Sequence, residues 1–223
     1  EATVAHDANA TAHERKQVNV VQLISSYRQR GHQKARLDPL NLEPRKNVPD
    51  LELSFHNLTN ADIDTQFQVG NLHIGKESAT LSEIVSSLEQ TYCNTIGAEF
   101  MHIIDSRQQH WIMKRMESVR SSPLLASDRK MQILRRLIKA EGLEKSLASK
   151  YPGTKRFGLE GGESLIPMLS ELVQRAGSYG AKEVVIGMAH RGRLNVLVNI
   201  FGKKPTELFS EFEGKTIYTS SGD

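Results

Sequence analysis

Two predicted strands separated by a helical pattern constrain the fold of this chain more than any other feature. Residues 155–159 form a short run bounded by Pro152-Gly153 and Gly161-Gly162, which is typical of a β-strand. Residues 183–188 form a nearly continuous apolar run, the pattern of a strand buried on both faces. The residues between them repeat with the period of an amphipathic helix, at Leu165, Met168, Leu169, Leu172, Val173 and Ala176.

A second helical pattern follows the second predicted strand. Its apolar positions are Leu194, Leu197, Val198 and Phe201, and Gly202 ends it. An order of strand, helix, strand and helix with short connections predicts a right-handed crossover and a parallel sheet. Residues 151–223 are therefore expected to begin an α/β domain.

The preceding part of the chain predicts helices. Residues 1–16 are polar, alanine-rich and aperiodic, which indicates a mobile leader or linker, and residues 17–150 indicate a helical segment. Thr80 and Glu83 form a capping box at the start of one of its helices. Thr59 followed by Asp62 indicates a short capped helix. Three further helices are expected: one with an apolar face at Val20, Val21, Ile24 and Tyr27, ended by Gly31; one over 107–119, burying Trp111, Ile112 and Met116 or their neighbours; and one from Ser127 whose apolar face continues past Gly142 to Leu147.

Composition excludes several classes of protein. The 223 residues are 38% hydrophobic and 25% charged, as in an ordinary globular protein. A net charge of +3 argues against a nucleic-acid partner, and no apolar run is long enough to span a membrane. Cys93 is the one cysteine in the sequence, which excludes a disulfide framework and a cysteine-based zinc site. The start at Glu1 instead of methionine indicates a processed beginning, so targeting information is not expected here.

His190 and Arg191 directly follow the second predicted strand, at the edge where open α/β sheets bind ligands. The histidine can donate, accept or shuttle a proton near neutral pH. The guanidinium offers a planar fork for a carboxylate or phosphate. The alternative is that His190 caps the turn while Arg191 and Arg193 are solvated, and the spacing alone leaves both interpretations open.

Longer motifs carry a family resemblance. The segments Lys155–Gly162, Leu165–Pro167 and Gly187–Leu197 closely resemble the 2-oxoglutarate dehydrogenase family, the thiamine-diphosphate-dependent decarboxylating enzymes. The resemblance extends from about Val18 onward, and the nearest family that could be confused with it acts on 2-oxoadipate. Its further motifs are Tyr27 with Arg30-Gly31-His32, Leu37–Leu40, Thr91–Cys93 and Ile96–Met101.

The resemblance implies a fold and roles for particular residues. It implies that the helical segment precedes the start of a thiamine-diphosphate-binding, transketolase-like parallel-sheet domain. His190 matches a catalytic histidine that contacts substrate and directs proton transfers. Arg191 matches a residue lining the thiamine diphosphate site, and Phe157 matches its aromatic wall, although Phe157 could equally belong to the core. Glu160 is a weaker candidate.

The implied activity is oxidative decarboxylation of 2-oxoglutarate in the tricarboxylic acid cycle, with transfer of the succinyl unit to the lipoyl group of a succinyltransferase core. The resemblance also implies a homodimer and magnesium, whose Gly-Asp…Asn ligand motif is incomplete here. The metal ligands are therefore expected outside this chain, and the chain alone is expected to be inactive. The alternatives are a 2-oxoadipate dehydrogenase and a non-catalytic interaction module on the same scaffold. The expected location is the cytoplasm of a bacterium, favoured over a mitochondrial matrix.

Overall fold

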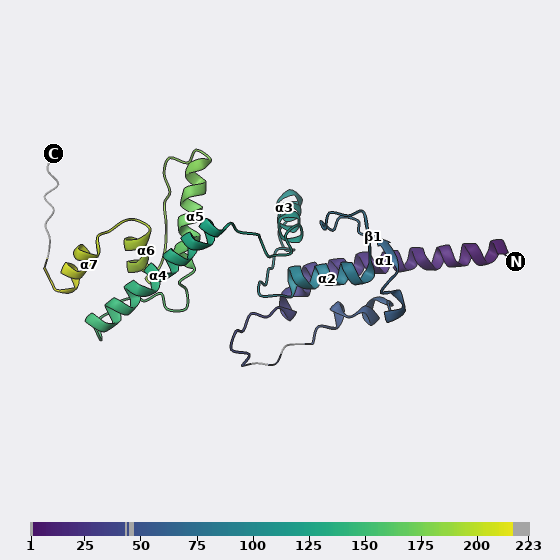
Figure 1. Ribbon diagram of the computed structural model, residues 1–223, viewed down its shortest axis with the longest axis horizontal. Helices are drawn as coiled ribbons and strands as arrows, with labels where there is room; N and C mark the ends of the chain where they lie inside the picture. The colour runs from purple at the N-terminus through teal and green to yellow at the C-terminus, as the bar shows by residue number, and fades with distance from the viewer. Residues whose placement is uncertain (1, 43, 45–46, 216–223) are drawn as a thin grey trace. The chain divides into compact units, whose positions relative to one another are not determined.

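The computed structural model describes residues 2–42, 44 and 47–215, which form two compact units with boundaries at 1–124 and 125–223. Figure 1 shows that helices dominate both. The predicted end of the α/β segment, 216–223, lies outside the described residues. Within the described part, no helix combines the length and apolar character needed to cross a bilayer.

The first unit contains three α-helices, three short 3-10 helices and one hairpin among its described residues. The elements are α1 (Ala2–Lys34), η1 (Pro49–Leu51), η2 (Leu53–His56), η3 (Asn60–Asp62), β1 (Gln66–Gln68), β2 (Ser78–Thr80), α2 (Leu81–Tyr92) and α3 (Ser106–Glu117). Helix α1 thus includes residues 2–16, for which the sequence predicted a leader. The strands are antiparallel, with Phe67 opposite Ala79 and both side chains buried.

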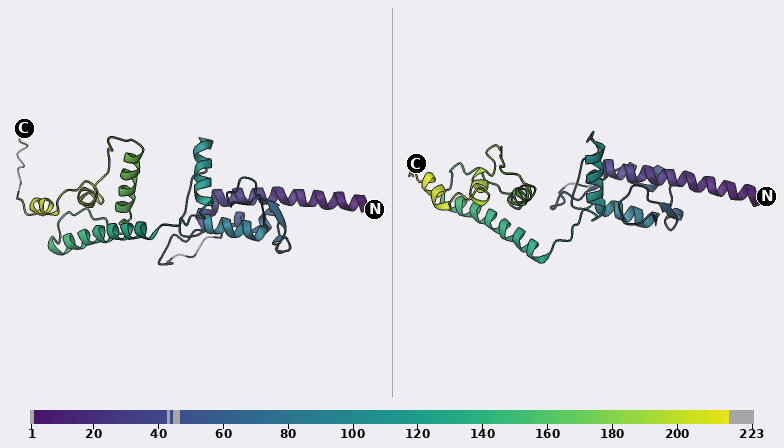
Figure 2. Two further views of the ribbon diagram at one scale, coloured as in Figure 1. Left: turned by 45° about the horizontal axis from the view of Figure 1, so that its top comes forward. Right: turned by 90° about the horizontal axis from the view of Figure 1, so that it is seen from above.

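Helices α1 and α2 lie side by side and build the core of this unit (Figures 1 and 2). The predicted stripe on α1 is confirmed at Val20, Ile24 and Tyr27, which are buried, but Val21 is half exposed. The predicted helix end at Gly31 is wrong. A Cβ atom at Gly31 would lie 2.5 Å from Tyr92 Cβ, so this glycine permits the close approach of the two helices.

The predicted caps are confirmed. At the start of α2, the Glu83 N–H donates to Thr80 Oγ1 at 3.2 Å, and the Thr80 N–H donates to Glu83 Oε2 at 3.1 Å. The 3-10 helix η3 carries the same arrangement between Thr59 and Asp62. Each cap satisfies N–H groups that have no partner within the helix, which fixes where the helix begins.

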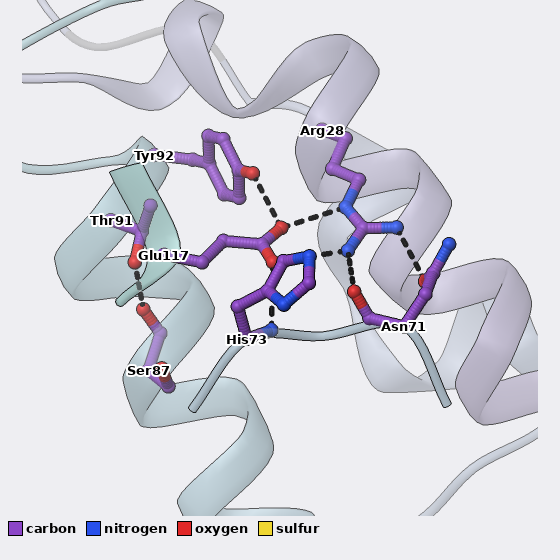
Figure 3. A network of polar contacts seen from close by, with 7 residues as sticks. All are labelled: Arg28, Asn71, His73, Ser87, Thr91, Tyr92 and Glu117. Carbon is purple, nitrogen blue, oxygen red and sulfur yellow. Dashed lines mark hydrogen bonds and ion pairs between the residues drawn. The ribbon is translucent and has the colours of Figure 1, made fainter. Parts of the chain in front are cut away.

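A buried polar network joins α1, α2 and α3 to the loop after β1 (Figure 3). Arg28 donates two hydrogen bonds to the Glu117 carboxylate, from Nε to Oε1 at 2.8 Å and from Nη2 to Oε2 at 3.1 Å. Tyr92 Oη donates to Oε1 at 2.7 Å, and the backbone N–H of His73 donates to Oε2 at 2.9 Å. The remaining Arg28 contacts are with Asn71, whose side-chain and backbone oxygens accept at 2.8 and 3.0 Å.

This network satisfies the Glu117 carboxylate completely, because four donors occupy its roughly four acceptor positions. Burial raises the pKa of the Tyr92 hydroxyl, and Glu117 raises it further, so the hydroxyl stays protonated and continues to donate. Glu117 and Met113 are the buried residues of α3, whereas Trp111 is mostly exposed. The predicted buried face of α3 is wrong at Trp111, whereas Ile112 and Met116 pack partly buried against the core beside the buried Met113 and Glu117.

The second unit is helical. It contains α4 (Ser127–Lys150), α5 (Leu165–Ser178), α6 (Arg193–Asn199) and α7 (Pro205–Phe212) among the residues described. Helix α4 runs unbroken through Gly142, as predicted. Helices α5 and α6 lie against α4 in all views (Figures 1 and 2). One buried apolar cluster of this unit contains Ala140, Leu159, Ile166 and Val196, and Leu147 and Leu208 are also buried.

The two predicted strands are not formed. Residues 155–159 and 183–188 have no regular secondary structure, and the parallel sheet is absent from residues 125–215. A strand is stable only when neighbouring strands satisfy its backbone and cover its side chains. Val185 is instead 92% exposed and Ile186 only half-buried, so the run with the pattern of a doubly buried strand is largely uncovered.

The helices beside these segments bury the predicted faces only in part, with Leu165 and Leu169 of the α5 stripe packed against the core. In α5 the buried residues are Ile166 and Ser170, while Met168 and Leu172 are more than half exposed. In α6 the buried residues are Asn195 and Val196.

We predict that Glu117→Ala lowers the free energy of unfolding of the first unit by about 3–5 kcal/mol, because it leaves the Arg28 charge buried without its partner. Urea denaturation followed by Trp111 fluorescence measures this. The control is Glu89→Ala, which removes an exposed ion pair with Lys34 and should cost less than about 1 kcal/mol. Equal losses in the two variants would contradict a structural role for the buried pair.

Candidate functional site

Two loops that are distant in sequence meet in the second unit. The Gly192 N–H donates to the Phe157 carbonyl at 2.7 Å. Arg191 Nη1 donates to the Gly158 carbonyl at 3.2 Å. These bonds join the end of the 183–188 segment to the 155–159 segment, so the two motifs that suggested a site lie together.

The Phe157 ring forms the centre of this site. The His190 ring lies with its centroid 5.2 Å away at an interplanar angle of 46°. The Arg193 guanidinium carbon lies 5.2 Å from the Phe157 centroid, within range of a cation–π contact. His190, Arg191 and Arg193 are exposed and Phe157 is half-buried. The structure thus brings together the three residues that the sequence singled out and adds Arg193.

Backbone geometry fixes how these loops meet. Gly192 has φ 76°, and a Cβ atom there would lie 2.6 Å from Leu159 Cδ1. Leu159 is buried in the core of the unit, so it cannot move aside without cost. Phe157 has φ 51°, a left-handed conformation that is unusual for a residue with a side chain and costs about 1–3 kcal/mol. Such conformations cluster at ligand sites, where surrounding contacts hold them.

Charge near the loop is predominantly positive. Arg191 and Arg193 flank Gly192, while the nearby carboxylate of Glu160 pairs with Arg156 at 3.2 Å. Glu160 also lies against Gly158, where a Cβ atom would collide with its carboxylate. An exposed imidazole, two guanidinium groups and an aromatic face can bind an anionic ligand that carries a ring system. Within the described ranges, no group of three or more His, Cys, Asp or Glu residues is arranged to hold a metal ion.

Sequence reasoning missed the polar residues under the loop. Asn195 is completely buried, and Glu144 on α4 is nearly so. The Asn195 side chain donates from Nδ2 to the Ala140 carbonyl and to Glu144 Oε1, both at 2.9 Å. The available signal was a polar residue inside the apolar run 194–198, which the helical pattern treated as facing solvent.

Comparison with known proteins gives a consistent result. No family model matches the chain. Over 99% of its length the chain is 59% identical to the 2-oxoglutarate dehydrogenase E1 component of Azotobacter vinelandii, of which it covers 23%. Proteins of the same name from Cupriavidus necator and Haemophilus influenzae are 52% and 44% identical over 91% and 93% of the chain, which covers 21% and 22% of them. The chain therefore spans less than a quarter of the length of these curated relatives.

We predict that Gly192→Ala destabilises the second unit by about 2–3 kcal/mol, because the methyl group meets Leu159 at a backbone angle that already disfavours it. Gly202→Ala is a matched control, since Gly202 has the same φ of 76° but no atom within 4 Å of a Cβ. That control should cost only about 1 kcal/mol. Thermal unfolding followed by circular dichroism measures both, and identical shifts would show that Leu159 does not constrain the loop.

Proposed function

We propose that this chain, which belongs to the 2-oxoglutarate dehydrogenase E1 family, is part of an enzyme that oxidatively decarboxylates 2-oxoglutarate and passes the succinyl unit to the lipoyl group of a succinyltransferase core. The observation that carries the proposal is the identity of 44–59% to E1 components along at least nine-tenths of the chain. The names of these relatives favour 2-oxoglutarate over 2-oxoadipate. Membership of this family also supports a homodimer as the assembled form. The bacterial sources of the relatives favour a location in a bacterial cytoplasm.

The transketolase-like parallel sheet is part of this proposal. Its support is the apolar surface that the second unit leaves exposed at Val185, Met168 and Leu172. The Azotobacter relative is about four times as long as this chain, so its remaining length could supply the strands that residues 155–159 and 183–188 lack. With those strands in place, both segments would acquire the backbone partners that a sheet requires.

The cofactor in this proposal is thiamine diphosphate, held with magnesium. The site residues fit such a group, because Phe157 offers an aromatic face while Arg191 and Arg193 offer cationic donors for a diphosphate. The bond to Gly158 uses one of the five N–H donors of Arg191. Bound thiamine diphosphate would supply the electron sink that decarboxylation of a 2-oxo acid needs. The magnesium ligands would come from outside this chain.

The proposed roles follow from position and chemistry. His190 would hydrogen-bond the substrate through a ring nitrogen and donate or accept a proton there, since its imidazole is exposed at the loop. Arg191 would bind an anionic group of the cofactor while Gly158 holds its guanidinium in place. Phe157 would line the site and exclude water from one side. The two carboxylates of 2-oxoglutarate suit the positive character of the loop.

We predict that His190→Ala in the full-length enzyme lowers kcat/KM for 2-oxoglutarate about 100-fold or more, the usual scale for a positioned acid–base group. Folding should change little, because His190 is exposed. His102→Ala, at another exposed histidine, is the control and should retain normal turnover. Near-normal turnover of the His190 variant would leave only the turn-capping role.

A separate prediction concerns Arg191. Its replacement should raise the thiamine diphosphate concentration needed for half-saturation about tenfold or more, with little change in substrate preference. Arg191→Lys should recover only part of the affinity, because lysine lacks the planar fork. Titration of the full-length apoenzyme measures both, with Arg135→Ala on the exposed face of α4 as the control. Unchanged half-saturation in Arg191→Ala and Arg191→Lys would refute the role.

A further inference from the structure

We propose that Asn195 and Glu144 are positioning residues that set the direction of α6 and thereby place His190 and Arg191. The inference rests on the proposed function of the loop and assigns no contact with substrate or cofactor to either residue. This role explains why the Asn195 amide and the Glu144 carboxylate are buried beside an apolar cluster.

The Asn195 side chain uses both ends of its amide. Nδ2 donates to the Ala140 carbonyl and to Glu144 Oε1, both at 2.9 Å, and Oδ1 accepts from Asn199 Nδ2 at 2.6 Å. Ala140 and Glu144 are one turn apart on α4, so the amide contacts two successive turns of that helix. Asn195 therefore fixes both the rotation of α6 about its axis and its position along α4.

Apolar packing alone would not fix α6 in this way. Val196 packs with Ala140 in the same core, and such contacts are non-directional. Helix α6 has seven residues, which is too short to be stable or to keep its direction without tertiary contacts. Burying an amide and a carboxylate costs free energy unless they are hydrogen-bonded, so what this pair adds is a defined orientation.

Backbone hydrogen bonds connect α6 directly to the loop that carries His190 and Arg191. The Val196 N–H donates to the Gly192 carbonyl at 3.0 Å, and the Arg193 N–H donates to the His190 carbonyl at 3.0 Å. Gly192 in turn donates to Phe157. A rotation of α6 would therefore move His190 and Arg191 relative to the Phe157 ring.

The Glu144 carboxylate would make this buried pair intolerant of a second negative charge at position 195. Its Oε2 is buried and has no hydrogen-bond partner among the described residues. A second carboxylate at position 195 would face Glu144 inside the protein, where two like charges cannot both ionise without a large cost. Substitution of Asn195 by aspartate therefore gives a test whose outcome depends on pH.

The test uses the full-length enzyme with Asn195→Ala, Asn195→Asp, and Asn195→Asp combined with Glu144→Gln. Relative to wild type at each pH, Asn195→Asp should lower kcat for 2-oxoglutarate about tenfold at pH 8 and less at pH 6, where the two carboxylates share a proton. The double variant should recover part of the lost activity and lose the pH dependence, because the introduced glutamine amide can donate to the introduced aspartate carboxylate while the Ala140 carbonyl stays without its donor. A pH-independent loss that Glu144→Gln does not reduce would overturn the proposal.

A second measurement does not depend on activity. Hydrogen exchange of residues 188–193 in the cofactor-free enzyme should be about tenfold faster in Asn195→Ala than in wild type, because the Gly192 N–H loses its fixed partner. Ile166→Val is the matched control, since it loosens the same core without touching Asn195 and should leave this exchange unchanged. Equal exchange in Asn195→Ala and wild type would overturn the proposal. Failure of the wild-type enzyme to act on 2-oxoglutarate would instead refute the proposed function, and the exchange result would still decide the positioning role.

Discussion

The first unit depends on one buried ion pair, between Arg28 and Glu117. Arg28 lies on α1 and Glu117 on α3, 89 residues later in the sequence. Tyr92 and the backbone of His73 supply the remaining hydrogen-bond donors to the Glu117 carboxylate. A buried charge is tolerated only when its hydrogen-bonding positions are filled. The pair therefore stabilises one arrangement of α1, α2, α3 and that loop, because displacement of any of these elements would leave a polar group unsatisfied.

Local signals in the sequence were sufficient where the structure is decided locally. The capping box at Thr80 and Glu83, the 3-10 helix after Thr59 and the unbroken helix through Gly142 are all confirmed. Each depends on residues within a few positions of one another, so pattern and propensity determine the outcome. Gly31 shows the limit of such signals, since its role is to admit Tyr92 from another helix and not to end its own.

Predictions that depend on distant parts of the chain were less successful. The 183–188 run has the composition of a doubly buried strand, yet a strand needs partners that residues 125–215 do not supply. The predicted buried stripe of α5 is likewise only partly packed, since Leu165 and Leu169 contact the core while Met168 and Leu172 are exposed. By contrast, His190, Arg191 and Phe157 lie together although no sheet is formed, because two hydrogen bonds between the loops join them. Their assignment to a functional site stays a prediction. Whether those residues have the proposed roles is a question for the variants.

The two buried carboxylates, Glu117 and Glu144, differ in how many of their oxygen atoms accept hydrogen bonds. Glu117 is saturated by four donors, which makes its surroundings rigid and gives it no capacity for another partner. Glu144 is satisfied at Oε1 alone, and its second oxygen is buried without a partner in the part of the chain described. Unsatisfied buried groups are rare and call for a physical explanation. Glu144 thus keeps the capacity for one further hydrogen bond directly beside Asn195, the residue that joins α4 to the helix that follows His190.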